Sequence, residues 1–86
     1  MQKQTKIPKS YKGMMMFEKG ATITNPYSSR SIYLNRVERS VYDALINTEL
    51  CTQFGAFNNP KLYQIIEDGR QWFIKNNIKA YGILID

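Results

Sequence analysis

The sequence predicts a small α+β domain in which an N-terminal β-hairpin packs on a two-helix hairpin, followed by a short C-terminal element. Two β-favouring stretches around a turn, and two later segments with apolar residues at helical spacing, carry this prediction. The chain has 86 residues, 43% of them apolar and 13% aromatic, which is enough for one modest core. We therefore expect residues 13–86 to form a single globular domain, preceded by a flexible basic arm over residues 1–12.

Two stretches, Ala21–Asn25 and Ser31–Leu34, favour strands because they contain β-branched and aromatic side chains. The residues between them include asparagine, proline and serine, which favour turns through local hydrogen bonds or a fixed φ angle. We therefore expect a β-hairpin with its turn at residues 25–30. Ahead of it, the apolar run Met14–Phe17 is either a buried strand or a stretch that packs over the core.

The sequence predicts a first helix over residues 34–48, because apolar side chains recur there at helical spacing. Asn35 and Glu38 have the spacing of a capping box, in which each side chain bonds the backbone N–H of the other residue. Arg39 and Asp43 are four residues apart, and we expect them to pair on the exposed face.

A second helix is expected from Pro60 to about Asn76. Asn59 suits the capping position, and proline is favoured at the first helical position because its missing N–H has no helical partner. Gly69 costs helix stability, which is tolerable if another backbone crosses closely there. The C-terminal run over residues 79–85 could be a strand or a short helix, since it is too short for its period to decide. The inner face of the second helix is predicted to carry Leu62, Ile65, Ile66, Gly69, Trp72, Phe73 and Asn76.

Most of the net charge of +5 lies in residues 1–12. This stretch has no acidic residue, whereas residues 13–86 hold eight bases against seven acids. A basic arm on a nearly neutral domain typically meets an anionic partner, and a solubilising tail is the alternative. The lysines of the arm recur at every third position, and in a polyproline II conformation they would share one edge. They are Lys3, Lys6, Lys9 and Lys12.

Three arginines follow close to one another in the sequence. Arg30, Arg36 and Arg39 could extend the positive surface of the arm as further contacts for an anionic partner. Cations near the start of a helix oppose its dipole, and such an unfavourable placement can indicate binding. The alternative is that Glu38 and Asp43 neutralise them.

The chain has no histidine and one cysteine. This composition excludes Ser-His and Cys-His nucleophile pairs, and it excludes an ordinary structural zinc site. Glu67 and Asp68 are adjacent, so they point about 100° apart on a helix and form no acid–base pair. We therefore expect no catalytic residue, no metal site and no cofactor, and predict that the protein is not an enzyme. Cys51 is expected to be a small buried side chain, and Trp72-Phe73 to pack in the core rather than to stack on bases.

The N-terminal segment lacks the apolar region of a signal peptide, and no stretch of the sequence is long enough to span a bilayer. A lone cysteine also favours a reducing compartment, because small secreted domains commonly contain several disulfides. We therefore expect a protein that is not secreted through a signal peptide and that has no membrane partner.

Scattered positions over residues 24–86 resemble a known group of proteins. The first set comprises Asn25-Pro26-Tyr27-Ser28, Leu34, Glu38, Val41-Tyr42-Asp43 and Ile46. The second set comprises Gly69, Trp72-Phe73, Asn76-Asn77, Ala80-Tyr81, Leu84 and Asp86. Together they resemble small proteins of tailed bacteriophages, marine and cyanobacterial phages included. The resemblance implies a phage protein that acts in the bacterial cytoplasm or in the virion and that ends in a short helix, but it implies no activity.

These observations predict a non-enzymatic phage protein that serves host takeover or assembly by binding a host or virion protein. The lysine arm would contact an anionic surface, with the three arginines as a second contact. The alternative is nucleic-acid binding through the same cations, which would weaken steeply with salt. A homodimer is a further expectation, because a short apolar run gains from burial between two copies. That run consists of Met14, Met15, Met16 and Phe17.

Overall fold

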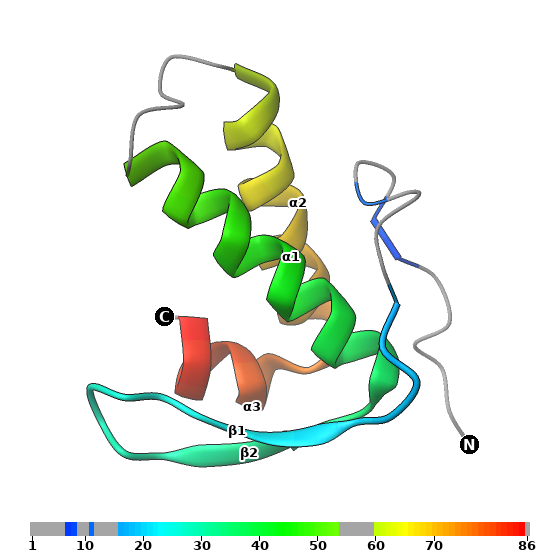
Figure 1. Ribbon diagram of the computed structural model, residues 1–86, viewed down its shortest axis with the longest axis vertical. Coiled ribbons are helices and arrows are strands. Elements are labelled where there is room, and N and C mark those ends of the chain that lie inside the picture. Colours follow the sequence, from blue (N-terminus) through cyan, green and yellow to red (C-terminus); the bar gives the residue numbers. More distant parts are fainter. Residues whose placement is uncertain (1–6, 9–10, 12–15, 54–59, 86) are drawn as a thin grey trace.

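The computed structural model describes residues 7–8, 11, 16–53 and 60–85. Within these ranges, a β-hairpin lies across one end of a pair of helices, and short C-terminal helical turns pack against both (Figure 1). This arrangement confirms the predicted α+β fold. The elements are β1 (Ala21–Thr24), β2 (Ser31–Leu34), α1 (Arg36–Gln53), α2 (Pro60–Asn76), α3 (Ile78–Ala80) and the π-helical turn η2 (Tyr81–Ile85). The predictions for Lys3, Lys6, Lys9, Lys12, Met14, Met15, Asn59 and Asp86 concern residues outside the described ranges.

The hairpin forms where the sequence predicted it. β1 and β2 pair antiparallel, in the register that places Ile23 opposite Ile32. Both isoleucines pack on the core, whereas the residues that alternate with them are exposed, as the period of two in a strand requires. The turn is closed by a hydrogen bond of 2.8 Å from Asn25 N to the Arg30 carbonyl.

α1 begins with the predicted capping box. Asn35 Oδ1 accepts a hydrogen bond from Glu38 N (2.8 Å), and Glu38 Oε1 accepts one from Asn35 N (2.9 Å). The helix does not end at Thr48, as predicted, but continues to Gln53. The residues after Thr48 therefore belong to the helix and not to a loop. Cys51 is exposed on this extension, so the prediction of a buried cysteine is wrong.

α2 begins at Pro60, as predicted, and buries one face against the rest of the domain. Trp72 and Phe73 meet edge to face with their ring centroids 5.1 Å apart, and Tyr42 of α1 meets Phe73 in the same way at 6.5 Å. The core placement predicted for Trp72-Phe73 is therefore confirmed. Such aromatic pairs stabilise the core beyond the area that they bury. The buried apolar residues are Tyr11, Leu34, Val41, Leu45, Ile66, Trp72, Phe73, Ala80, Ile83 and Leu84.

Tyr11 lies in the segment that was predicted to be a flexible arm, yet its side chain is only 2% exposed. Its hydroxyl donates a hydrogen bond to the Ile65 carbonyl (2.8 Å), and its ring lies against Gly69 of α2. A Cβ at Gly69 would overlap the Tyr11 hydroxyl, so the glycine makes room for a side chain rather than for a crossing backbone. At Tyr11 the structure thus differs from the predicted arm, because burial of its aromatic ring against α2 is favourable.

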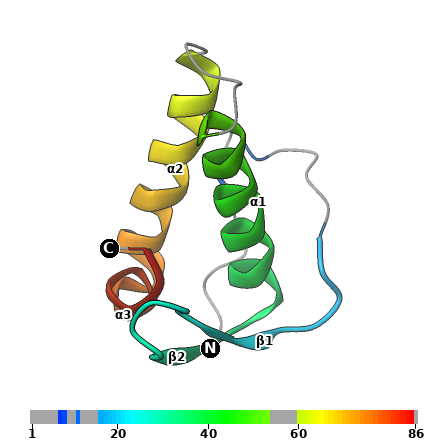
Figure 2. The same ribbon diagram turned by 60° about the vertical axis from the view of Figure 1, so that its left-hand side comes forward.

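The C-terminal residues form α3 and η2 rather than a strand, and Figure 2 shows α3 beside the end of α2 and next to the hairpin. Asn77 caps α3, since its Oδ1 accepts a hydrogen bond of 3.0 Å from Ala80 N. The Nδ2 of Asn77 donates to Oε2 of the buried Glu38 (3.0 Å). The carboxylate that caps α1 therefore also holds the start of α3.

Candidate interaction surface

The described residues divide into two regions of different charge. We define the hairpin end as residues 16–40 and 77–85, which lie around the β-hairpin, and the helical pair as residues 41–53 and 60–76 (Figures 1 and 2). The hairpin end holds five bases and two acids, of which Glu38 is buried. The helical pair holds three bases and four acids. The domain that the sequence describes as nearly neutral thus has one positive end. Its bases are Lys19, Arg30, Arg36, Arg39 and Lys79.

Two of the three predicted contact arginines bind the protein's own backbone. Arg36 Nε donates to the Phe17 carbonyl (3.2 Å), and Arg39 Nη1 donates to the Lys19 carbonyl (3.1 Å). The Arg39 guanidinium also lies 3.9 Å from the centroid of the Phe17 ring, a cation–π contact. In the part of the chain that the structure describes, Arg39 forms no ion pair with Asp43, so that predicted pairing is wrong. Both arginines hold residues 17–19 on α1.

A buried serine completes this attachment. Ser40 Oγ accepts a hydrogen bond from Phe17 N (2.9 Å) and donates one to the Arg36 carbonyl (2.7 Å). Met16 and Phe17 are half-buried, lie outside any strand and do not pack against the main core cluster, so neither predicted alternative holds for these two residues. Phe17 and Lys19, which precede the hairpin, are instead fixed on α1 by Ser40, Arg36 and Arg39.

Arg30 has a different environment, because it ends the hairpin turn and is exposed. We call residues 25–30 the hairpin tip. Asn25 shapes it: its Oδ1 accepts from Tyr27 N (2.8 Å), and its Nδ2 donates to the Ile83 carbonyl of η2 (2.9 Å). Ser29 has a φ of 64°, a left-handed conformation that a non-glycine residue adopts at some cost. The backbone of the tip is thus held in one shape, while the Tyr27 side chain is 97% exposed.

The solvent-facing side of the two strands continues this exposed surface. Thr22, Thr24, Ser31 and Tyr33 alternate with the residues that face the core, and Tyr33 is 61% exposed. The hydroxyls of Thr24 and Ser31 lie 2.7 Å apart across the strands and share a hydrogen bond. Sequence reasoning missed Tyr33 as a surface candidate, although the period of two predicts that its side chain points outward.

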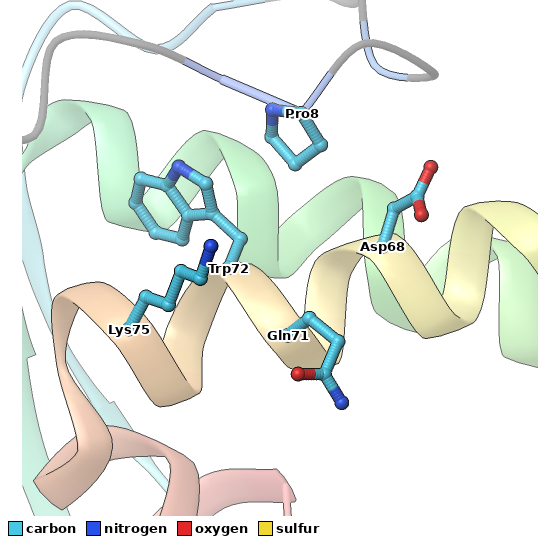
Figure 3. A pocket seen from close by; sticks show the side chains of 5 residues that line it. All are labelled: Pro8, Asp68, Gln71, Trp72 and Lys75. Atoms are coloured by element: carbon cyan, nitrogen blue, oxygen red, sulfur yellow. The ribbon is translucent and has the colours of Figure 1, made fainter.

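A hollow of about 330 Å³ lies on α2, beside the N-terminal segment. Figure 3 shows Pro8 facing the Trp72 indole ring, with the Lys75 amine near the ring and the Asp68 carboxylate further along the helix. Gln71 completes the lining. The hollow thus combines an apolar wall with one cation and one anion on a single helical face.

The two adjacent acids of α2 are bonded separately. Glu67 Oε2 accepts a hydrogen bond from Gln71 Nε2 (2.9 Å), and Asp68 Oδ1 accepts one from Gln64 Nε2 (2.7 Å). Each bond joins side chains one helical turn apart, on the outside of the helix. The two carboxylates therefore act as separate surface groups.

A second hollow of about 370 Å³ lies near the far end of the helical pair. The Arg70–Glu49 ion pair crosses it, with Nη2 and Oε2 3.2 Å apart. Thr52, Tyr63 and Ile66 line the remainder. Here one helix is tied to the other by an exposed ion pair, an interaction that contributes little to stability.

Within the described ranges, no three histidine, cysteine or acidic side chains are grouped closely enough to hold a metal ion. The helices of the same ranges include none that combines the length and the apolar character of a bilayer span. Compared with protein-family models, with curated proteins and with solved structures, the chain matches none.

Proposed function

We propose that the chain is a non-enzymatic interaction protein that binds an acidic protein partner at its hairpin end. The observation that supports this is the separation of charge, with an excess of bases at the hairpin end and an excess of acids on the helical pair. A surface of one sign raises the rate of encounter with a partner of the other sign and orients it. Such a partner would approach with its acids toward the hairpin.

The lysine arm adds to this attraction. Lys3, Lys6, Lys9 and Lys12 precede Phe17 and Lys19, which are fixed on α1 by Ser40, Arg36 and Arg39. The arm therefore enters the domain close in sequence to the hairpin end. In this arrangement the arm attracts the partner over a distance, and the hairpin end makes the contacts of the bound complex.

The resemblance to small tailed-phage proteins suggests where the partner is found. We propose a host or virion protein in a bacterial cell, which makes host takeover or virion assembly the process served. A bacterial lysate is consequently the first place to look for the partner.

Nucleic-acid binding is the second candidate. The observation that favours it is the exposure of two aromatic rings, Tyr27 and Tyr33, on the same hairpin as the exposed Arg30. Bases stack on such rings while cations contact the phosphates. In that case the affinity for an oligonucleotide would fall with salt by a slope set by the number of phosphates contacted.

The test is a pull-down from nuclease-treated bacterial lysate with the immobilised full chain. Deleting residues 1–12 would remove Tyr11 from the core, so the charge of the arm is halved by Lys3→Gln and Lys6→Gln instead. The matched control is Lys61→Gln with Lys75→Gln, which removes the same charge from the helical pair. We expect a bound protein that is reduced severalfold by the arm variant and unchanged by the control.

Two results would contradict the proposal. Recovery of nucleic acid alone, only from untreated lysate, would favour the second candidate. A captured protein that is retained equally by the arm variant and by an additional Arg30→Gln variant would remove charge attraction as the cause of binding.

A further inference from the structure

We infer that the solvent-facing side of the β-hairpin, together with its tip, is the recognition surface, and that it takes an acidic linear segment of a partner protein. This inference rests on the proposed function, because it names the contact surface and the chemistry of the partner. The recognition surface consists of Thr22, Thr24, Tyr27, Arg30, Ser31 and Tyr33.

Two large aromatic side chains are exposed on this small hairpin. Tyr27 is 97% exposed and Tyr33 is 61% exposed, so both rings leave most of their area available to a partner. Tyrosine gives a large contact area with few rotatable bonds, and its hydroxyl adds a hydrogen bond at the edge of the ring. For this reason tyrosines dominate the binding energy of many protein interfaces.

The recognition surface is held in one shape without a partner. The Asn25 side chain fixes both the turn, through Tyr27 N, and the position of the hairpin on η2, through the Ile83 carbonyl. The tip is also closed by a hydrogen bond of 2.8 Å from Ser29 N to the Asn25 carbonyl. A surface that is held in its bound shape loses less conformational entropy on association.

The charge of the recognition surface also favours an acidic partner. Arg30 is exposed at the edge of the surface, and no acidic residue occurs between Ala21 and Asn35. The hydroxyls of Thr22, Thr24 and Ser31 can donate hydrogen bonds to carboxylates or to a peptide backbone. Cationic, aromatic and hydroxyl groups without a competing acid together suit an acidic segment.

The contacts of the arginines favour a protein over a nucleic acid. A duplex or single strand presents a regular row of phosphates, and affinity grows with the number that are neutralised. Arg36 and Arg39 donate to the carbonyls of Phe17 and Lys19, which leaves Arg30 as the arginine of the recognition surface. One arginine beside two tyrosines is typical of a protein contact, where a few residues carry most of the energy.

The experiment is selection from a phage-displayed library of random peptides about twelve residues long against the immobilised full chain. Enriched peptides are then synthesised, and their affinity is measured by fluorescence anisotropy for the unaltered chain and three variants. The variants are Tyr27→Ser, Arg30→Gln and the control Tyr63→Ser, which removes a tyrosine that is 52% exposed on α2. All three side chains are exposed, so each variant is expected to fold, which circular dichroism and a urea titration check.

We expect the enriched peptides to have a net negative charge. Their affinity should fall at least about tenfold for Tyr27→Ser and severalfold for Arg30→Gln, and stay unchanged for Tyr63→Ser. Each of three results would overturn the inference: no peptide enriched over the Tyr27→Ser chain, enriched peptides without negative charge, or equal losses in the Tyr63→Ser control.

A single-stranded oligo-dT probe is titrated in parallel with the same variants. Binding of this probe that is lost with Tyr27→Ser, without any enriched peptide, would assign the surface to nucleic acid instead. If the peptide selection fails while the lysate pull-down still depends on the arm lysines, the proposed function stands and the recognition surface is wrong. If peptide binding does not depend on Tyr27 or Arg30, and the lysate pull-down does not depend on the arm lysines, both proposals fail.

Discussion

The helical pair and the hairpin end differ in the kind of contact that stabilises each region. Between α1 and α2 the contacts are mainly apolar, and the ring of Tyr11 fills the space over Gly69. At the hairpin end, hydrogen bonds join separate elements: Glu38 to Asn77, Ser40 to Phe17 and Asn25 to Ile83. Apolar burial supplies most of the stability of a domain, whereas buried hydrogen bonds penalise every arrangement that leaves them unmade. The hairpin that carries the exposed Tyr27 and Tyr33 is therefore positioned partly by directional polar contacts, whereas the helical pair is stabilised mainly by apolar burial.

The largest expected effect concerns the apolar side of the comparison. Replacing Tyr11→Ala removes a buried ring and a hydrogen bond to Ile65, and we expect it to destabilise the domain by about 3 kcal/mol. Urea unfolding followed by circular dichroism measures the change. The matched control is Tyr27→Ala, which removes an exposed ring and should cost less than about 0.5 kcal/mol. Equal midpoints for the two variants would mean that Tyr11 is no part of the core.

The second-largest expected effect is a difference in stability loss between variants of two glutamates of α1. Glu38→Ala leaves the partly buried donors of Asn35 and Asn77 without their acceptor, and we expect a loss of about 2 kcal/mol. Glu49→Ala breaks only the exposed ion pair with Arg70 and should cost less than about 1 kcal/mol. The comparison uses the same denaturation assay. If Glu49→Ala lowered the free energy of unfolding as much as Glu38→Ala does, polar contacts would not stabilise mainly the hairpin end.

The third effect depends on pH. Burial, with smaller contributions from Asp68 and Glu49, raises the pKa of the Tyr11 phenol above its ordinary value of 10.0. The unfolded chain therefore loses this proton first, and stability is complete below pH 10 and falls as the pH rises from there toward the folded-state pKa. The contribution of one such group is up to about 1.4 kcal/mol per pH unit.

Comparison with Tyr11→Phe isolates this group from the other titrating side chains. The variant loses the hydrogen bond to Ile65 at every pH, but its stability should fall less steeply than that of the unaltered chain above pH 10. Urea midpoints at several pH values between about 8 and 11 give the two slopes. Parallel slopes would show that the Tyr11 phenol ionises as easily in the folded chain as in the unfolded one.

The smallest effect compares two arginines of the hairpin end. Arg39→Gln removes the cation over the Phe17 ring and the bond to the Lys19 carbonyl, and should cost about 0.5–1 kcal/mol. Arg30→Gln removes an exposed side chain and should change stability by less than about 0.5 kcal/mol. A thermal melt of each variant distinguishes them. If Arg30→Gln were the more destabilising, the assignment of Arg39 to structure and Arg30 to binding would be reversed.

Local sequence signals were sufficient for much of the fold. The capping box of Asn35 and Glu38, the proline at the start of α2 and the β-branched residues around the turn all act within a few residues, and each predicted its element. The end of α1 was missed because a helix without a clear stop signal is terminated by the rest of the structure.

The contacts of the candidate surface were harder to predict. Nothing in the sequence pattern indicates that Arg36 and Arg39 donate to carbonyls of Phe17 and Lys19, because these partners lie about 20 residues away. The burial of Tyr11 depends on Gly69 in the same way. Charge and periodicity predict which faces are polar or apolar, but they do not predict which distant group a side chain meets.

The long-range hydrogen bonds of Tyr11 and Asn25 also limit the order in which the chain can fold. Tyr11 binds a carbonyl 54 residues later, and Asn25 binds one 58 residues later. On the ribosome neither bond can form until Ile65 and then Ile83 have emerged, although the hairpin and α1 are complete much earlier. Until α2 has emerged, the apolar side of α1 has no partner helix to cover it. Loop closure over such distances is slow compared with helix formation, so we expect these two hydrogen bonds to form in the final step of folding.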